Sequence, residues 1–344
     1  MELKNKYRLL QAQLEGLETQ VWLKDHTTFG IGGPADLFYR AQTVKELIKA
    51  VRLARELQIP YFILGGGSKL LVADQGFRGL VIKNQAQEIK LLSNDRIRAA
   101  SGINNPILVQ FCRRHSLTGL EFLIGIPGTL GGAVRHNARF RDPRDFFTPV
   151  TDLKAVRNCY LADFVVKVRL LHPDGRLSWQ DRSYCQFQPH TSGFREDPEK
   201  RKEIILEVIL QLRPGQPKEI DRLIKAMLAW RQGRRLGQRK LVDPITRRVN
   251  PQPRGRSAGC IFANTPNRWG HPAGRLIDLC GLKGRRIGGA KISEEHANFI
   301  INNQSATAAD VVKLIDLIKR EVKKKFQVEL KEELEYLGFD PPLT

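Results

Sequence analysis

The chain has 344 residues, of which 41% are hydrophobic and 27% are charged. This length suffices for two domains, and the composition is typical of a folded globular protein. Nowhere does an apolar run approach the roughly 18 residues that a membrane-spanning helix needs, and the N-terminal residues lack the pattern of a signal peptide. These features argue against a membrane span and predict a cytoplasmic protein.

The formal net charge is +21, with basic residues concentrated at 231–256 and 319–325. Such a charge attracts polyanions or a phosphorylated substrate. The other interpretation is a solvated basic surface, which we favour over nucleic-acid binding because no interleaved aromatic pattern accompanies the charge. The five cysteines are scattered and never form a Cys-x-x-Cys pair, so we expect neither a disulfide framework nor a metal site.

The first half of the chain alternates helical and strand-like patterns. Residues 1–20 carry leucines at irregular helical spacing and predict one N-terminal helix. Apolar runs typical of strands then alternate with amphipathic segments. The expected strands are 35–39, 61–64 and 79–82, and the expected helices are 44–57 and 106–115. This alternation with short connections predicts an α+β or α/β fold.

The second half begins with a charged, proline-containing stretch at 140–158 that predicts a loop. Strands are expected beyond it at 164–171, 176–179 and 203–212. Pro214-Gly215-Gln216-Pro217 then interrupts the pattern and is the preferred domain boundary. Helices are expected at 220–230 and 308–325, separated by a basic, proline-rich loop that runs to residue 256.

Two glycine-rich turns, each flanked by apolar runs, are the strongest functional signal. Glycine has no Cβ atom, so its backbone can approach a ligand closely and successive N–H groups can surround a pyrophosphate. Two such turns in one chain favour a phosphate-bearing cofactor over simple tight turns. The candidate cofactor-binding residues are Gly65, Gly66, Gly67, Ser68 and Lys69 in the first turn, and Gly125, Pro127, Gly128, Thr129, Gly131 and Gly132 in the second.

Several segments resemble, in order, those of the UDP-N-acetylenolpyruvoylglucosamine reductase family, also called UDP-N-acetylmuramate dehydrogenase or MurB. They are residues 28–36, the first glycine turn, and residues 119–134, 257–262, 273–278, 281–284, 287–290 and 293–300. Together they span roughly residues 25 to 338. The family form without an inserted tyrosine loop in its third domain is the closer match.

The resemblance implies an α+β protein with a two-subdomain FAD-binding (PCMH-type) α/β fold, followed by a smaller α/β substrate-binding domain. The corresponding bounds are 1–22 for the N-terminal helix, 23–213 for the FAD-binding domain and 218–340 for the substrate-binding domain. FAD is then expected to lie with its pyrophosphate against the two glycine turns. The implied reaction uses NADPH to reduce the enolpyruvyl ether of a UDP-sugar for peptidoglycan synthesis, and the implied enzyme is a monomer.

The resemblance also assigns roles to individual residues. Cys260 stands where the family has the serine that protonates C2 of the substrate, and a free thiol, with a pKa of about 8.5, gives up a proton more readily than a hydroxyl does. Glu333 aligns with the catalytic glutamate in the closing segment. His190 stands where the family has an arginine that holds substrate, because Tyr-Arg has become Pro189-His190. Asn264 is the expected substrate contact.

Departures from the family pattern leave other functions open. Lys69 replaces the usual asparagine after the first glycine turn, and as a cation beside a phosphate site it is expected to bind the FAD pyrophosphate. The loss of the arginine at His190 motivates a second hypothesis, a catalytically impaired paralogue that binds FAD or UDP-sugar without turnover. The net charge of +21 motivates a third, a polyanion-binding protein that reuses the fold.

Overall fold

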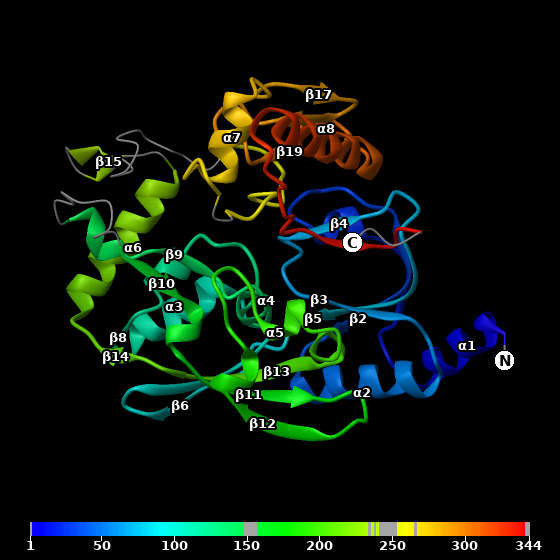
Figure 1. Ribbon diagram of the computed structural model, residues 1–344. Helices are drawn as coiled ribbons and strands as arrows, with labels where there is room; N and C mark the ends of the chain where they lie inside the picture. Colours follow the sequence, from blue (N-terminus) through cyan, green and yellow to red (C-terminus); the bar gives the residue numbers. More distant parts are fainter. Residues whose placement is uncertain are drawn as a thin grey trace. The chain divides into compact units, whose positions relative to one another are not determined.

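The computed structural model describes residues 2–147, 157–232, 235–236, 239–240, 253–264 and 267–340. The chain forms two compact units (Figure 1). Unit 1 comprises Met1–Tyr39, Ala54–Ile82 and Gln252–Thr344, and unit 2 comprises Arg40–Leu53 and Lys83–Pro251. Each has its own hydrophobic core and mixes helices with strands, so the expected α+β class is confirmed. Among the helices of the described ranges, none has the length and hydropathy of a membrane-spanning segment.

A four-stranded sheet with the order β1-β2-β5-β3 forms the N-terminal part of unit 1. Its strands are β1 (Glu18–Trp22), β2 (Pro34–Ala41), β5 (Phe77–Asn84) and β3 (Tyr61–Leu64). β1 pairs antiparallel with β2. Buried and partly exposed residues alternate at the two ends of β2, whereas Leu37, Phe38 and Tyr39 in its middle are all buried. Ala35 and Phe38 pack with Leu23 in a small core. The helix α1 (Leu3–Gln13) precedes this sheet.

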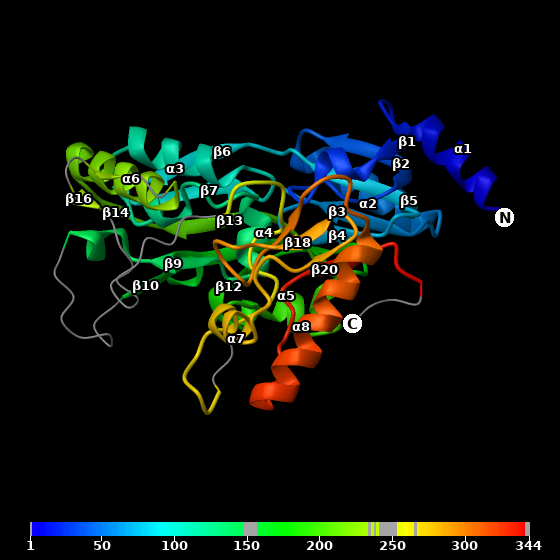
Figure 2. The ribbon, with the colours of Figure 1, turned by 90° about the horizontal axis from the view of Figure 1, so that it is seen from above.

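The C-terminal part of unit 1 returns to the first glycine turn. β20 (Glu335–Leu337) pairs in parallel with β4 (Leu70–Val72), so the red end of the chain lies beside a blue segment (Figure 1). The antiparallel strands β17 (Arg286–Ile287), β18 (Ala290–Ile292) and β19 (Ile300–Asn302) form a small sheet. Against it packs α8 (Ala308–Phe326), which contacts α7 (Ala273–Leu279) (Figure 2).

Local sequence signals at both ends of α8 and along its buried face explain why the sequence predicts this helix well. Thr307 and Asp310 form a reciprocal capping box at its start. Three lysines lie in its last turn, where their positive charges interact favourably with the negative end of the helix dipole. Its apolar stripe is buried, from Val311 to Phe326. The carboxylate of Asp74 also accepts from the amides of Ala308 and Ala309, which ties the helix start to the segment that follows β4.

Unit 2 is built on a five-stranded antiparallel sheet with the order β12-β11-β13-β7-β6. The strands are β12 (Leu177–Asp181), β11 (Val165–Leu171), β13 (Ile204–Gln211), β7 (Arg96–Ala100) and β6 (Ile89–Ser93). Two-stranded pairs join β14 (Arg213–Pro214) to β8 (Leu117–Thr118), β10 (Asn158–Tyr160) to β9 (Arg139–Arg141), and β15 (Arg235–Leu236) to β16 (Arg239–Lys240). The α-helices described in this unit are most of α2 (Val44–Glu56), together with α3 (Asn105–Arg114), α4 (Leu130–Arg135), α5 (Gly193–Glu196) and α6 (Pro217–Arg231).

Most expected elements are present within one or two residues of their expected bounds, including α2 (Val44–Glu56), α3 and β13. The N-terminal helix expected over residues 1–22 is wrong in its extent, because it ends at Gln13 and residues 18–22 form β1. Gly16 lies between them with φ +77°, a conformation that glycine adopts without strain and that ends a helix. The β-branched and aromatic residues of β1 favour a strand.

The expected loop at 140–158 is partly wrong, because its two ends pair as β9 and β10 and a short 3-10 helix, Pro143–Phe146, follows β9. Its residues 148–156 lie outside the described residues. The expected boundary at 214–217 also differs from the division into units. Pro217 is the first residue of α6, a position proline favours, and Ile220 and Met227 pack into the core of unit 2.

Candidate active site

Three segments far apart in the sequence meet within unit 1. Lys69 directly precedes β4 and Glu333 lies two residues before β20, so the parallel pairing of these strands brings the two residues together. The carbonyl of Lys69 accepts from the amide of Glu335, and the amide of Glu333 donates to the carbonyl of Ile261, both at 2.8 Å. The main chain thus places the residue after Cys260 against Glu333.

The side chain of Lys69 joins the two expected catalytic residues. Its Nζ lies 2.6 Å from Oε2 of Glu333 and 2.6 Å from the carbonyl oxygen of Cys260. Only 25% of the Lys69 side chain and 11% of the Glu333 side chain are exposed. Charges removed from water to this degree are stable only when paired and hydrogen-bonded, and this pair satisfies both conditions. Cys260 itself is partly exposed.

A buried amide holds the segment that carries Cys260. Asn298 is only 2% exposed. Its Oδ1 accepts from the amide of Phe262 at 2.9 Å, and its Nδ2 donates to the carbonyl of the same residue at 2.8 Å. Next to it, Nδ1 of His296 accepts from the amide of Asn298 at 3.2 Å. Burial lowers the pKa of His296 to about 4, so this histidine is neutral and structural near pH 7.

Asn264 lies at the end of the same segment. Its Oδ1 accepts from the amide of Ala273 at 3.0 Å, at the first turn of α7, while the residue remains exposed. Residues 265 and 266 lie outside the described residues. The side chain therefore has a structural contact in addition to its expected role toward the substrate.

The first glycine turn is required by a close approach within the chain itself. Gly67 has φ +64°, and a Cβ atom there would lie 2.4 Å from the carbonyl oxygen of His26. Its own carbonyl accepts from the amide of Thr28 at 3.1 Å. The side chain of Thr28 in turn donates to the carbonyl of Ser257 at 2.7 Å. The turn is thus bound to the segment that leads to Cys260.

The second glycine turn belongs to unit 2 and leads into α4. The amides of Leu130 and Gly131 donate to the carbonyls of Ile103 and Ser101, at 2.9 and 2.7 Å, and so are occupied by the chain. At Gly132, by contrast, an added Cβ atom would meet nothing closer than Oγ1 of Thr129 at 3.9 Å. The open part of the turn is therefore at Gly132.

A buried polar atom beside this turn has no hydrogen-bond partner among the described residues. Asn105, the first residue of α3, donates its amide to the carbonyl of Gly128 at 3.1 Å and its Nδ2 to the carbonyl of Ile126 at 3.2 Å. Its Oδ1 is buried and accepts no hydrogen bond within the described part of the chain. An orphaned acceptor of this kind suits the N–H group of a ligand.

His190 also belongs to unit 2. It has φ +66° and lies in a tight turn closed by two hydrogen bonds between Gln188 and Thr191. The turn is fastened to the end of α4, because Asn137 donates to the carbonyl of Gln188 at 2.8 Å and Ser192 to that of Arg135 at 2.7 Å. Ser192 and Asn137 thus hold this turn, whereas Cys260 and Glu333 belong to unit 1.

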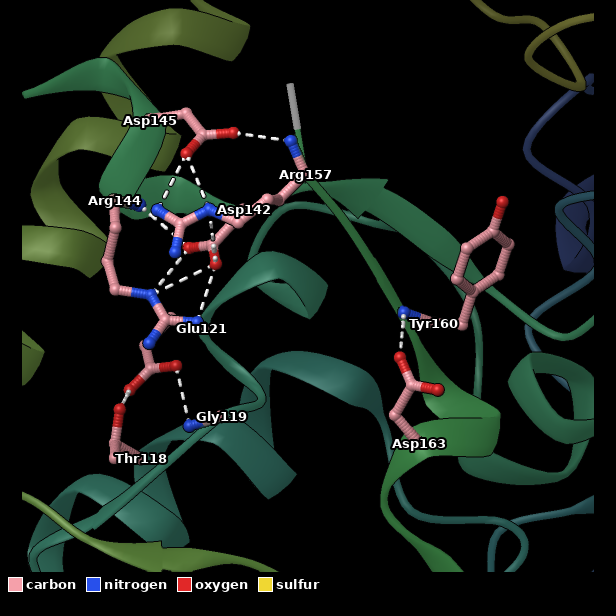
Figure 3. Close-up of polar contacts among 9 residues, drawn as sticks. All are labelled: Thr118, Gly119, Glu121, Asp142, Arg144, Asp145, Arg157, Tyr160 and Asp163. Atoms are coloured by element: carbon pink, nitrogen blue, oxygen red, sulfur yellow. Dashed lines mark hydrogen bonds and ion pairs between the residues drawn. The ribbon is translucent and has the colours of Figure 1, made fainter. Parts of the chain in front are cut away.

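The motif at 119–122 contributes an internal brace rather than a ligand contact. Glu121 is 4% exposed, and its carboxylate accepts from Oγ1 of Thr118 at 2.6 Å and from the amide of Gly119 at 2.8 Å (Figure 3). These contacts close the chain just before the second glycine turn. The sequence signal is the glycine two residues before a glutamate that is followed by apolar residues.

A charged cluster that was not predicted from the sequence flanks residues 148–156. Arg144 pairs with Asp142, and Arg157 pairs with Asp145 through both its guanidinium and its amide (Figure 3). Although burial opposes its charge, Asp142 has its pKa held below the ordinary value by the hydrogen bonds from Arg144. These contacts explain the charges of the segment as structural.

Arg231 begins the basic stretch 231–256, whose charge was expected to attract polyanions or a phosphorylated substrate. Its guanidinium lies over the ring of Phe140, 4.6 Å from the centroid, and burial lowers its pKa to about 10. The side chain also fills the space at Gly125, where a Cβ atom would lie 2.7 Å from it. Arg234 lies outside the described residues, as do the side chains of Arg235 and Lys240.

Comparison with known proteins defines the class. Residues 35–140 match the FAD binding domain, and residues 250–337 match the C-terminal domain of UDP-N-acetylenolpyruvoylglucosamine reductase. The chain thus contains an FAD-binding domain and, after it, a C-terminal domain of the type found in this reductase.

Relatives over almost the whole length narrow the class to one family. The UDP-N-acetylenolpyruvoylglucosamine reductase of Moorella thermoacetica is 38% identical over 327 residues, covering 94% of this chain and 95% of the relative. That of Carboxydothermus hydrogenoformans is 34% identical and covers 92% of each chain. The crystal structure of the Thermus caldophilus enzyme (MurB) is 34% identical, with a TM-score of 0.69 over 94% of this chain and 99% of that chain. The chain belongs to the UDP-N-acetylenolpyruvoylglucosamine reductase family.

Proposed function

We propose that this protein is an FAD-dependent oxidoreductase that uses NADPH to reduce UDP-N-acetylglucosamine enolpyruvate to UDP-N-acetylmuramate, a precursor of peptidoglycan. The observation that carries the proposal is the meeting of Cys260 and Glu333, the two residues with expected catalytic roles in unit 1, around the ammonium of Lys69. Family membership over nearly the whole chain supports the same reaction.

The residues of the second glycine turn fit an FAD cofactor. The orphaned Oδ1 of Asn105 can accept from a donor of the cofactor, and the open space at Gly132 leaves room for a phosphate. Gly125, Pro127, Gly128, Thr129 and Gly131 shape this turn, and Gly65, Gly66, Gly67 and Ser68 shape the first. When bound, FAD supplies the relay of hydride from NADPH to C3 of the enolpyruvyl group.

Cys260 would complete the reduction by giving its thiol proton to C2 of the substrate, where negative charge develops after hydride reaches C3. The resulting thiolate regains a proton from solvent. Glu333 lies against the main chain of the same motif and would orient this transfer. Asn298 keeps the motif in place through its two hydrogen bonds to Phe262.

His190 would take the place of the family's arginine toward the substrate, since a histidine can carry positive charge but lacks the bidentate fork of a guanidinium. Asn264 would contact the UDP-sugar. We propose a cytoplasmic monomer whose partner is this small-molecule substrate, and whose positive charge is a solvated surface rather than a nucleic-acid-binding one.

Steady-state assay of the purified yellow holoenzyme tests the proposal. NADPH oxidation should require UDP-N-acetylglucosamine enolpyruvate and should yield UDP-N-acetylmuramate in equal amount. A flavin-loaded protein that binds UDP-sugar without turnover would instead be the impaired paralogue. A colourless protein whose affinity for nucleic acid falls steeply with salt would be the polyanion-binding protein.

A further inference from the structure

Lys69 occupies an unusual position for a residue expected to bind a phosphate. It follows the first glycine turn, yet its ammonium contacts Cys260 and Glu333, two residues that come much later in the sequence. A Cβ atom added at Gly259 would lie 3.9 Å from this nitrogen, so the ammonium also faces the residue before Cys260. The side chain is thus inserted between the two segments with expected catalytic residues.

The backbone fixes this arrangement on both sides of the lysine. The Lys69 carbonyl is bonded to the Glu335 amide, and the Glu333 amide is bonded to the Ile261 carbonyl. An exposed pair of long side chains gains little from contact, because water competes and the side chains lose conformational freedom. Here the Lys69 and Glu333 side chains are only 25% and 11% exposed, so water competes less for their charges than at an exposed pair.

The ion pair changes what Lys69 can offer a phosphate. An ammonium in contact with a carboxylate forms a nearly neutral unit, and moving the ammonium to a pyrophosphate would break an ion pair that is largely removed from water. The asparagine that the family has at this position is shorter and uncharged, so it cannot make the same ion pair. The substitution therefore adds a contact that is particular to chains with lysine here.

We propose that Lys69 is a positioning residue for the proton-transfer step, which holds the Glu333 carboxylate in one place beside the main chain of Cys260. The inference rests on the proposed function, because it concerns protonation of C2 by Cys260. Lys69 then acts on the reaction of reduced flavin with substrate. It does not act on the binding of FAD or on the reduction of flavin by NADPH.

Anaerobic half-reactions of the holoenzyme test this division, with Lys69→Met as the variant. Lys323→Met is the matched control, since Lys323 also pairs with a glutamate, Glu329, at 2.6 Å, but both side chains are exposed. We expect Lys69→Met to slow flavin reoxidation by UDP-N-acetylglucosamine enolpyruvate by about tenfold or more. Flavin reduction by NADPH and the Kd for FAD, measured by fluorescence, should stay within about threefold of the control.

Lys69→Arg keeps the test decisive if Lys69→Met folds poorly, and a double variant tests whether the lysine acts through Glu333. Lys69→Arg keeps the charge and should recover most of the reoxidation rate. The pair Lys69→Met with Glu333→Gln should be no slower than Glu333→Gln alone, because the lysine acts through the glutamate.

The alternative outcomes separate the inference from the function on which it rests. An FAD affinity that falls by tenfold or more in Lys69→Met, with reoxidation unchanged once flavin is bound, would make Lys69 a phosphate contact and overturn the inference. Unchanged FAD affinity with unchanged reoxidation would overturn it as well. If the unaltered holoenzyme is not reoxidised by the substrate at all, the proposed function itself fails.

Discussion

The side chain of Asn298 makes two hydrogen bonds to the main chain of Phe262. Its Oδ1 accepts from the Phe262 amide at 2.9 Å, and its Nδ2 donates to the Phe262 carbonyl at 2.8 Å. Asn298 and Phe262 are both buried, so removing the Asn298 side chain would leave the amide and carbonyl of Phe262 without these hydrogen bonds. Phe262 is two residues beyond Cys260, and this contact therefore sets the path of the candidate catalytic segment.

Replacing this amide should destabilise unit 1. We expect Asn298→Ala to lower the free energy of unfolding by about 2–4 kcal/mol, since each unsatisfied main-chain group costs about 1–3 kcal/mol. Chemical denaturation measures the loss. Asn303→Ala, at an exposed position, is the control and should change stability by less than about 0.5 kcal/mol. Equal losses in the two variants would contradict the role assigned to Asn298.

Stability should also depend on pH through His296. Its pKa is lowered to about 4 in the folded state by burial, whereas a histidine in the unfolded chain has a pKa of about 6.5. The unfolded state thus binds the proton first, and the stability present above pH ~6.5 is lost as the pH falls toward about 4.

Comparison with His296→Gln isolates this contribution. Between pH 7 and pH 4, the unaltered protein should lose on the order of 2 kcal/mol more than the variant, which has no ring to protonate. Protonation of Nδ1 would also break its bond from the Asn298 amide. Parallel pH dependences of the two proteins would show that His296 is not the titrating group.

The proposed acid role of Cys260 predicts a selective kinetic defect. Cys260→Ala should leave flavin reduction by NADPH unchanged and slow reoxidation by substrate by about 100-fold, the usual contribution of a general acid. Cys260→Ser should keep most of the activity, because it restores the residue found in the family. Stopped-flow absorbance of the flavin separates the two half-reactions, and an equal slowing of both would remove Cys260 from the acid role.

Alkylation offers a test of Cys260 that does not depend on turnover. Burial raises the pKa of Cys112, Cys159 and Cys185 to about 12 and also raises that of Cys280, so their reactive thiolate forms are scarce near pH 8. We expect iodoacetamide to modify Cys260 first, as read by peptide mass spectrometry. Faster labelling of any other cysteine would contradict the expected order.

The proposed role of His190 toward the substrate is tested by replacing its side chain while keeping its backbone conformation. Asparagine tolerates the positive φ of this position, so His190→Asn should fold normally while kcat/KM falls by about tenfold through loss of the imidazole ring. His190→Arg restores the family's residue and should equal or exceed the unaltered enzyme. If His190→Asn keeps full activity, His190 has no part in holding the substrate.

The sequence predicted regular elements well where local signals agree. The helix α8, with its capping box and buried apolar stripe, and the strand β2 appear within two residues of the expected ranges 308–325 and 35–39. It predicted α1 poorly, because a left-handed glycine and the pairing of β1 with β2 overrode the helical spacing of the leucines. The family, its cofactor and its reaction followed from motif order rather than from any single motif.

The lysine contact could not be predicted, for a physical reason. Lys69 and Glu333 are 264 residues apart, and only the parallel pairing of β4 with β20 brings them together. Four glutamates crowd the closing segment, and sequence alone gives no means to decide which of them meets the lysine. The occupied amides of Leu130 and Gly131 were hidden likewise, since their acceptors come from the preceding segment.

A single-turnover experiment shows whether the reduced flavin of this protein reduces the enolpyruvyl ether of the UDP-sugar. The flavin of the purified holoenzyme is reduced with one equivalent of NADPH in the absence of oxygen and then mixed with UDP-N-acetylglucosamine enolpyruvate. The account predicts that the oxidised flavin spectrum returns with formation of one equivalent of UDP-N-acetylmuramate, and that UDP-N-acetylglucosamine has no such effect. Flavin that stays reduced in the presence of the enolpyruvyl substrate would contradict it.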